Sequence, residues 1–165
     1  MGIELEVRTQ GVIFTPAATA IWDREITRAL EIIIMNLKNK IVLATPAYTG
    51  TLQNSVTAEQ RGTGFNRQGV VGTPSKYAWV IEKGRLPGSF PNIDAVKTWA
   101  KRKLGVPEGP ALDRTAYLIC RAIYQKGTKG VKMFEKTFES ERARILKMLD
   151  EAVARVTKRL NGGAA

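Results

Sequence analysis

The stretch Trp22–Ile41, WDREITRALEIIIMNLKNKI, decides the fold of this chain. Its apolar side chains recur every three or four residues, the period of one face of an α-helix, at Trp22, Ile26, Leu30, Ile33, Leu37 and Ile41. Ile32, Ile34 and Met35 widen this face beyond a single stripe. We expect so broad an apolar face to be covered on two sides, either within the domain or by another subunit.

The ends of this helix and the segment before it are also marked in the sequence. Thr15 and Pro16 form a typical helix start, and Pro46 ends the pattern. Ahead of it, charged residues alternate with Ile3, Leu5 and Val7, which predicts a strand. Residues 1–14 are therefore either an edge strand of the chain's own sheet or an arm that adds to a neighbouring subunit.

Short β-like segments follow the long helix. The sequence predicts strands over 56–60, 69–73 and 77–82, with Gly-rich or Pro-containing turns between them. Because the connections are too short for a parallel crossover, the three strands are expected to form an antiparallel meander. In the third strand, Tyr77 and Trp79 would share one face, and Glu82 would lie on the other.

The remaining chain predicts further helices. One begins at the capping residue Asn92 and stops at Gly105, a second ends at Gly127, and a last helix covers 145–160 after a turn or helix start at 133–138. The predicted fold class is α+β, with a long N-terminal helix packed on a small antiparallel sheet and followed by two or three helices. We expect a single domain over 15–160 and a disordered tail over 161–165.

The composition argues against catalysis. The 165 residues include 26 Lys and Arg, 15 Asp and Glu, no histidine and a single cysteine, Cys120. Histidine is the commonest general base and metal ligand, and one cysteine allows neither an intramolecular disulfide nor a Cys-rich zinc site. No glycine-rich segment has the lysine and the spacing of a phosphate-binding loop. We expect no enzyme activity, no cofactor and no metal.

The net charge of +11 is unevenly distributed. Acidic and basic residues cancel over 1–43, so the whole excess lies in 44–165. Such a field attracts nucleic acid without reading its sequence, although solvated helix faces would explain the charge equally simply. The basic residues expected to face DNA are Arg61, Arg67, Lys126, Lys129 and Lys132. The charged side chains within the most apolar segment, 26–43, argue against a membrane span.

Ordered motifs add a family resemblance. TPAYTGTLQNSV (45–56) resembles a Pro-x-x-Thr-Gly-x-Leu-x-x-Ser-[Ile/Val] signature, and VGTPSKYAWVIEKGRLPG (71–88) resembles a Tyr-Ala-x-x-[Val/Ile]-Glu-x-Gly segment. PNIDAVKTWAKRKLG and AIYQKGTKGVKMFEKTF are similar to later segments of the same family. The family is the gene-product-ten-like tail component of lambdoid long-tailed bacteriophages, also called tail completion or neck proteins. Tyr48 departs from the acid usual before Thr-Gly, so no role of that acid carries over.

The resemblance implies a structural virion protein without catalysis. Its subunits would form a homo-oligomeric ring around the DNA channel at the neck or tail end, after assembly in the host bacterial cytoplasm. Implied partners are connector or stopper proteins, tail-tube or tail-terminator proteins, and genomic double-stranded DNA held by nonspecific electrostatics. Candidate subunit contacts are Ile3, Leu5, Val7, Ile34, Met35, Tyr77, Trp79 and Glu82. The alternative function is that of a basic accessory protein that binds DNA without sequence preference.

Overall fold

The computed structural model describes residues 2–7, 16–47 and 50–162. The chain divides into two compact units, residues 1–75 with 133–165 and residues 76–132. In the sequence, the second unit lies between the sheet and the last helix of the first unit. The elements of the first unit are β1 (Gly2–Val7), α1 (Pro16–Ala44), α2 (Thr51–Asn54), β2 (Thr57–Arg61), β3 (Arg67–Gly72) and α6 (Met133–Gly162).

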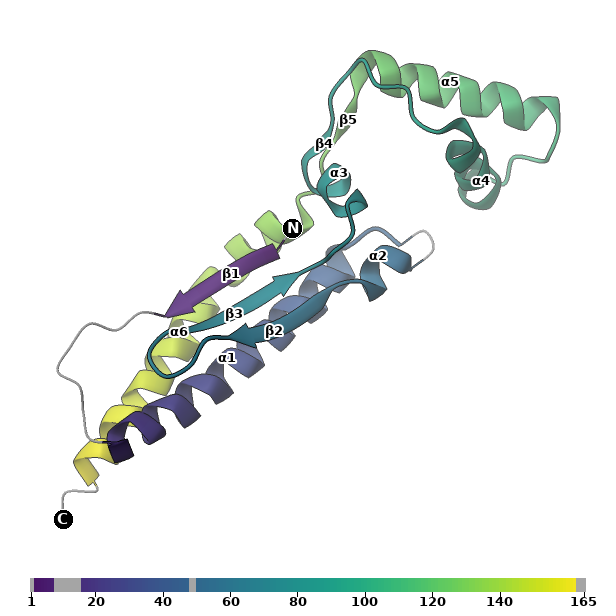
Figure 1. Cartoon of the computed structure of the whole chain (residues 1–165). Helices are drawn as coiled ribbons and strands as arrows, with labels where there is room; N and C mark the ends of the chain where they lie inside the picture. The colour runs from purple at the N-terminus through teal and green to yellow at the C-terminus, as the bar shows by residue number, and fades with distance from the viewer. Residues whose placement is uncertain (1, 8–15, 48–49, 163–165) are drawn as a thin grey trace. The chain divides into compact units, whose positions relative to one another are not determined.

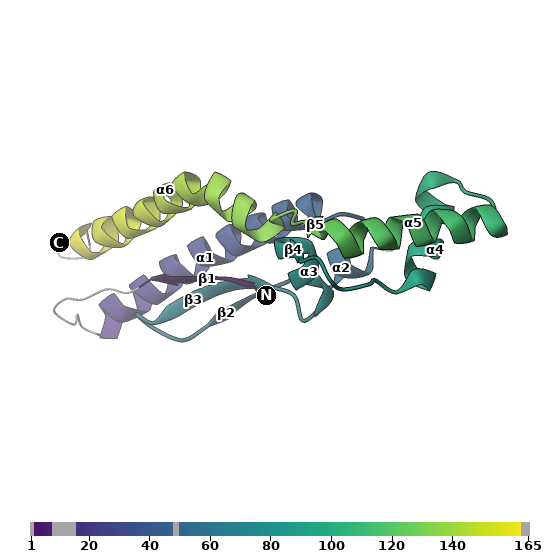
Figure 2. The same cartoon turned by 90° about the horizontal axis from the view of Figure 1, so that it is seen from above.

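The first unit is built on the antiparallel pair α1 and α6, which lie side by side in Figures 1 and 2. Near one end of the pair, Trp22, Ile26 and Leu30 of α1 form a core cluster with Ala152 and Val156 of α6. At the other end, the Thr45 hydroxyl lies 3.2 Å from the sulfur of Met133, the first residue of α6. The stripe from Trp22 to Ile41 is thus covered within the chain, whereas Ile32 and Met35, which widen it, stay about half exposed.

A three-stranded antiparallel sheet of order β1-β3-β2 packs on these helices. β2 and β3 form a hairpin in which Ala58 pairs with Val71, and both strands contact α1. β1 pairs with the other edge of β3, with Ile3 opposite Val71, and contacts α6. The N-terminal segment is therefore an edge strand of its own sheet in this structure, the first of the two arrangements predicted for it.

Gly69 lets the sheet approach α1 closely. A Cβ atom at this position would lie 2.5 Å from Cγ2 of Ile34 and 3.6 Å from Cδ2 of Leu30, which are both buried core residues. The first distance is too short for two carbon atoms, so a larger residue would push the strand away from the helix. The absence of a side chain at Gly69 thus sets the spacing of β3 and α1.

The segment after α1 satisfies the backbone at the helix end. The Gln53 side-chain amide donates hydrogen bonds to the carbonyl oxygens of Val42 and Thr45, both at 3.1 Å. These are carbonyls that a helix C-terminus leaves without intrahelical partners. Gly50 has a φ of 75°, a left-handed backbone conformation that glycine adopts at little cost, and so allows the turn after α1. The preceding Thr49 lies outside the described residues.

The second unit contains a helical hairpin and a short ribbon. Its helices α4 and α5 pack together through buried Ala100 on α4 and Leu112, Ala116 and Cys120 on α5. The Asn92 side chain accepts hydrogen bonds from the first turn of α4, as predicted. The elements are α3 (Tyr77–Lys83), β4 (Gly84–Arg85), α4 (Ile93–Leu104), α5 (Pro110–Lys126) and β5 (Thr128–Lys129).

The strand predicted over 77–82 is wrong, because this segment forms helix α3. Ala78 and Glu82 are the buried residues of α3, and their spacing of four is that of a helix face. The β-branched and aromatic residues of the segment favour a strand by propensity alone, and tertiary context overrides that preference. The third strand of the sheet is β1 instead.

The last helix is longer than predicted. Residues 133–138, predicted as a turn or helix start, and residues 145–160 belong to the one helix α6, which runs on to Gly162. Of the predicted tail, 163–165 lie outside the described residues. The predicted fold class is confirmed: a long N-terminal helix packs on a small antiparallel sheet, and further helices follow. None of the helices in the described ranges is long and apolar enough to cross a membrane.

We expect Gly69→Val to destabilise the first unit by about 1–3 kcal/mol, because the added methyl groups overpack the contact with Ile34. Urea unfolding followed by circular dichroism measures this loss. Gln68→Ala, at the neighbouring position whose side chain lies on the opposite face of β3, is the matched control and should change the unfolding free energy little. Equal stabilities of Gly69→Val and the parent chain would contradict the close approach.

Candidate functional site

The candidate subunit contacts separate into buried and exposed side chains. Ile34 is 5% exposed and packs in the core of its own chain, so it is not available to a neighbouring subunit. Met35, the next residue of α1, is 48% exposed, and Ile32 lies one turn away with 45% of its surface exposed. The side chains of Ile3, Leu5 and Val7 lie outside the described part of the structure, and only their backbone pairing is known.

The candidates on α3 also divide. Tyr77 and Trp79 are 60% and 57% exposed, whereas Glu82 is buried. The Glu82 carbonyl oxygen accepts a hydrogen bond from the backbone N–H of Lys132, so this residue helps to join α3 to the segment after β5. Tyr77 and Trp79 thus keep the exposure that a subunit contact needs, and Glu82 has a place inside the chain.

Arg67, predicted to face DNA, is bound within the chain instead. Its Nε and Nη2 atoms donate to the two carboxylate oxygens of Asp23 at 2.7 and 2.8 Å, a bidentate pair between β3 and α1. The Gly64 backbone N–H donates to the same carboxylate at 3.1 Å. The hydrogen bond from Arg67 is the main reason that the pKa of Asp23 lies below its ordinary value.

The other predicted DNA contacts lie in different parts of the chain. Arg61 is exposed at the end of β2 and pairs with Glu59. Lys126, Lys129 and Lys132 are exposed in the second unit, at the end of α5, in β5 and just after it. These three gather along one short segment, and the structure does not join them to Arg61 in one described patch.

A basic groove that the sequence did not predict lies between α1 and α6. The groove is open to solvent and has a volume of about 330 Å³. The residues that line it are Glu25, Arg28, Ala29, Ile32, Arg155 and Arg159. Glu25 is only 5% exposed. Its carboxylate lies 3.3 Å from Nε of Arg155 and 3.2 Å from Nη1 of Arg159. One buried carboxylate thus holds two arginines one helical turn apart on α6.

The groove carries more positive charge than Glu25 neutralises. Arg155 and Arg159 remain about half exposed although they pair with Glu25. The side chain of Arg28 has neither a hydrogen bond nor an ion pair with any residue that the structure describes. Nε of Arg24 also lies 4.0 Å from the Glu25 carboxylate. Chemically, this arrangement can accept an anionic group, because several guanidinium N–H donors face solvent beside a single satisfied acid.

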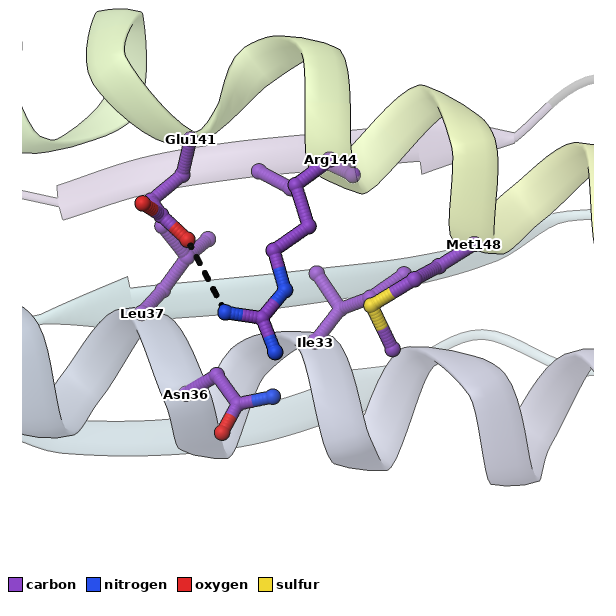
Figure 3. A pocket seen from close by; sticks show the side chains of 7 residues that line it. Ile33, Asn36, Leu37, Glu141, Arg144 and Met148 are labelled. Atoms are coloured by element: carbon purple, nitrogen blue, oxygen red, sulfur yellow. Dashed lines mark ion pairs between the residues drawn. The ribbon is translucent and has the colours of Figure 1, made fainter.

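A second hollow between the same helices is too small for a ligand (Figure 3). Its volume is about 10 Å³, which is no more than a single water molecule needs. Figure 3 shows Arg144 reaching from α6 toward Asn36 of α1, and a dashed line marks its ion pair with Glu141. The Nη1 atom of Arg144 and the Glu141 carboxylate are 3.8 Å apart. Ile33 and Leu37 form its apolar wall. This region is a packed helix contact.

The described residues contain no cluster of three or more His, Cys, Asp or Glu that could hold a metal ion. Cys120 is buried on α5, and burial raises the pKa of its thiol, which disfavours the nucleophilic thiolate. Comparison of the chain with protein-family models, with curated proteins and with solved structures finds no match.

Several aromatic side chains of the second unit are partly exposed. Tyr117 and Tyr124 of α5 are 52% and 47% exposed. The ring of Phe90 lies 6.3 Å from that of Tyr117 and 6.2 Å from that of Tyr124, centre to centre. Together they form an aromatic patch on the helical hairpin. The spacing of seven between the two tyrosines, two helical turns, is the sequence signal that could have shown it.

We expect Asp23→Asn to lower the free energy of unfolding by about 1 kcal/mol at pH 7, since the Arg67 pair is partly exposed. Because folding lowers the pKa of Asp23 from its ordinary 3.8, the stabilisation is present above about pH 4 and is lost as the pH falls through the depressed value. Urea titrations of both proteins at several pH values measure this difference. A difference that stays constant down to pH 2 would contradict the pairing.

Proposed function

We propose that this chain is a structural virion protein of a tailed bacteriophage, which forms a ring at the neck or tail end around the DNA channel. The observation that carries the proposal is the exposure of Tyr77 and Trp79, 60% and 57%, within the segment that resembles the family's Tyr-Ala-x-x-[Val/Ile]-Glu-x-Gly motif. Ala78 and Glu82 of that segment are buried. Its aromatic residues are therefore free to contact a neighbouring subunit.

The first resembling segment supports the proposal differently. Its Leu52 is buried, and the Ser55 hydroxyl lies 2.6 Å from that of Thr73 at the end of the hairpin. The Ser55 hydroxyl also lies 2.7 Å from the Leu52 carbonyl. These residues contribute to the fold, which is the role that a structural protein would give its sequence motifs. Met35 on α1 offers a second exposed apolar residue for assembly.

The exposed apolar residues form two separate surfaces, which is the number that a closed ring requires of each subunit. A head-to-tail ring needs two different patches on each subunit, which meet as one subunit follows the next. Met35 with Ile32 lies in the first unit, and Tyr77 with Trp79 in the second. We propose these two pairs as the opposed surfaces of one subunit contact, in the virion tail or neck, with the connector and tail-tube proteins as further partners.

The second candidate function is a basic accessory protein that binds double-stranded DNA without sequence preference. The charge of +11 and the arginine groove favour it. Two measurements together distinguish the two candidate functions. One is the affinity for duplex DNA at several salt concentrations, and the other is the mass of the protein species that binds. A protein that binds tightly as a monomer, with no tendency to assemble, would favour the accessory role over the ring.

We expect the purified chain to associate in a concentration-dependent way, and Trp79→Ala to weaken that association by about tenfold, the loss typical of an aromatic side chain central to an interface. Light scattering measures the mass, and circular dichroism checks the fold of the variant. Trp99→Ala removes the same side chain from α4 and should leave association nearly unchanged. A strict monomer at all concentrations, with no assembly on tail tubes or connectors, would contradict the proposal.

A further inference from the structure

The groove between α1 and α6 points to a binding site separate from the residues that the sequence singled out. Its lining gathers Arg28 from α1 with Arg155 and Arg159 from α6, although these residues lie more than a hundred positions apart in the chain. Only Glu25 among the lining residues is acidic. Glu31 and Glu151, one turn from the groove on their own helices, are not part of its lining.

The charge of the groove is held in place by the fold. Glu25 is buried and contacts Arg155 and Arg159 with different carboxylate oxygens, at 3.3 and 3.2 Å. Each guanidinium has five N–H donors, so both arginines keep donors for a further group after the contact with Glu25. Their half exposure places those donors at the open side of the groove. Arg28 contributes a third guanidinium without a partner among the described residues.

An external polyanion matches the charge of the groove. Several of the chain's acids are already used in ion pairs with its own bases: Asp23, Glu25, Glu59, Glu108, Asp113 and Glu141. A second copy of the chain also carries a net charge of +11, so the two net charges repel, whereas a polyanion is attracted. Arginine matches the geometry of phosphate, and a polyanion supplies many phosphates at once.

We propose that the α1–α6 groove binds backbone phosphate groups of double-stranded nucleic acid through Arg28, Arg155 and Arg159. This inference deepens the proposed function, since it assigns the DNA contact to the first unit, but the site stands on its own geometry whether or not the chain forms a ring. The contact is sequence-independent, because phosphates carry no base information. Glu25 acts as a positioning residue that orients the two α6 arginines.

The test is binding of a fluorescently labelled 20-base-pair duplex, measured by anisotropy over a range of salt concentrations. We expect Arg28→Gln to reduce the slope of log affinity against log salt by about 0.9, the value for one lost phosphate contact, which is roughly an eightfold loss at 0.1 M salt. Arg28→Lys keeps the charge and should retain most of the slope. Because Arg28 has no partner among the described residues, its replacement should leave the unfolding transition unchanged.

Arg142→Gln is the matched control, because it removes the same charge from an exposed position of α6 outside the groove. Equal effects of Arg28→Gln and Arg142→Gln would show that net charge alone drives binding and would overturn the site.

Stabilisation by inorganic phosphate that depends on Arg28, with no effect of Arg28→Gln on duplex binding, would reassign the groove to free phosphate and overturn the proposal. A change in self-association without a change in duplex binding would also overturn it. Failure of ring formation in light scattering, with the Arg28 effect intact, would count against the ring alone.

Discussion

The antiparallel contact of α1 with α6 is the constraint on which the first unit depends. The two helices come from opposite ends of the chain, and each brings one apolar face that is buried only when the other is present. Fully burying one large aliphatic side chain contributes about 1.5–3 kcal/mol, so the shared row of such residues dominates the stability of this unit. The sheet then covers the remaining apolar surface of α1, where Gly69 permits its close approach. Residues 76–132 form a separate compact unit, which lies in the sequence between β3 and α6.

The α1–α6 pair also determines which basic side chains remain available to a partner. Glu25 lies one position before Ile26 of the buried face, which places a carboxylate at the edge of the core and requires cations beside it. Arg155 and Arg159 of α6 pair with this carboxylate, and about half of each side chain is still exposed to solvent. Arg67 forms an ion pair with Asp23 in a similar way, so its guanidinium is engaged within the chain. Basic residues near α1 thus divide into those that stabilise the fold and those, such as Arg28, that remain available to a partner.

Local patterns in the sequence predicted much of the fold and little of the site. The spacing of Trp22, Ile26 and Leu30 was enough for α1, since periodicity depends on neighbours along the chain. The β-branched and aromatic residues of 77–82 favoured a strand, and only contacts distant in sequence decide that Ala78 and Glu82 are buried together on a helix. The members of the groove could not be predicted, because Arg28 and Arg155 meet only after α1 and α6 have packed. An acid beside an apolar helical stripe, as at Glu25, was the available signal.

We propose that the chain assembles as a ring around DNA, and electron microscopy of the purified chain, with and without duplex DNA, can reveal such rings. We expect closed rings with a central opening, in which added duplex DNA passes through that opening. Single subunits scattered along the outside of the duplex, or particles that never close into rings at any protein concentration, would contradict it.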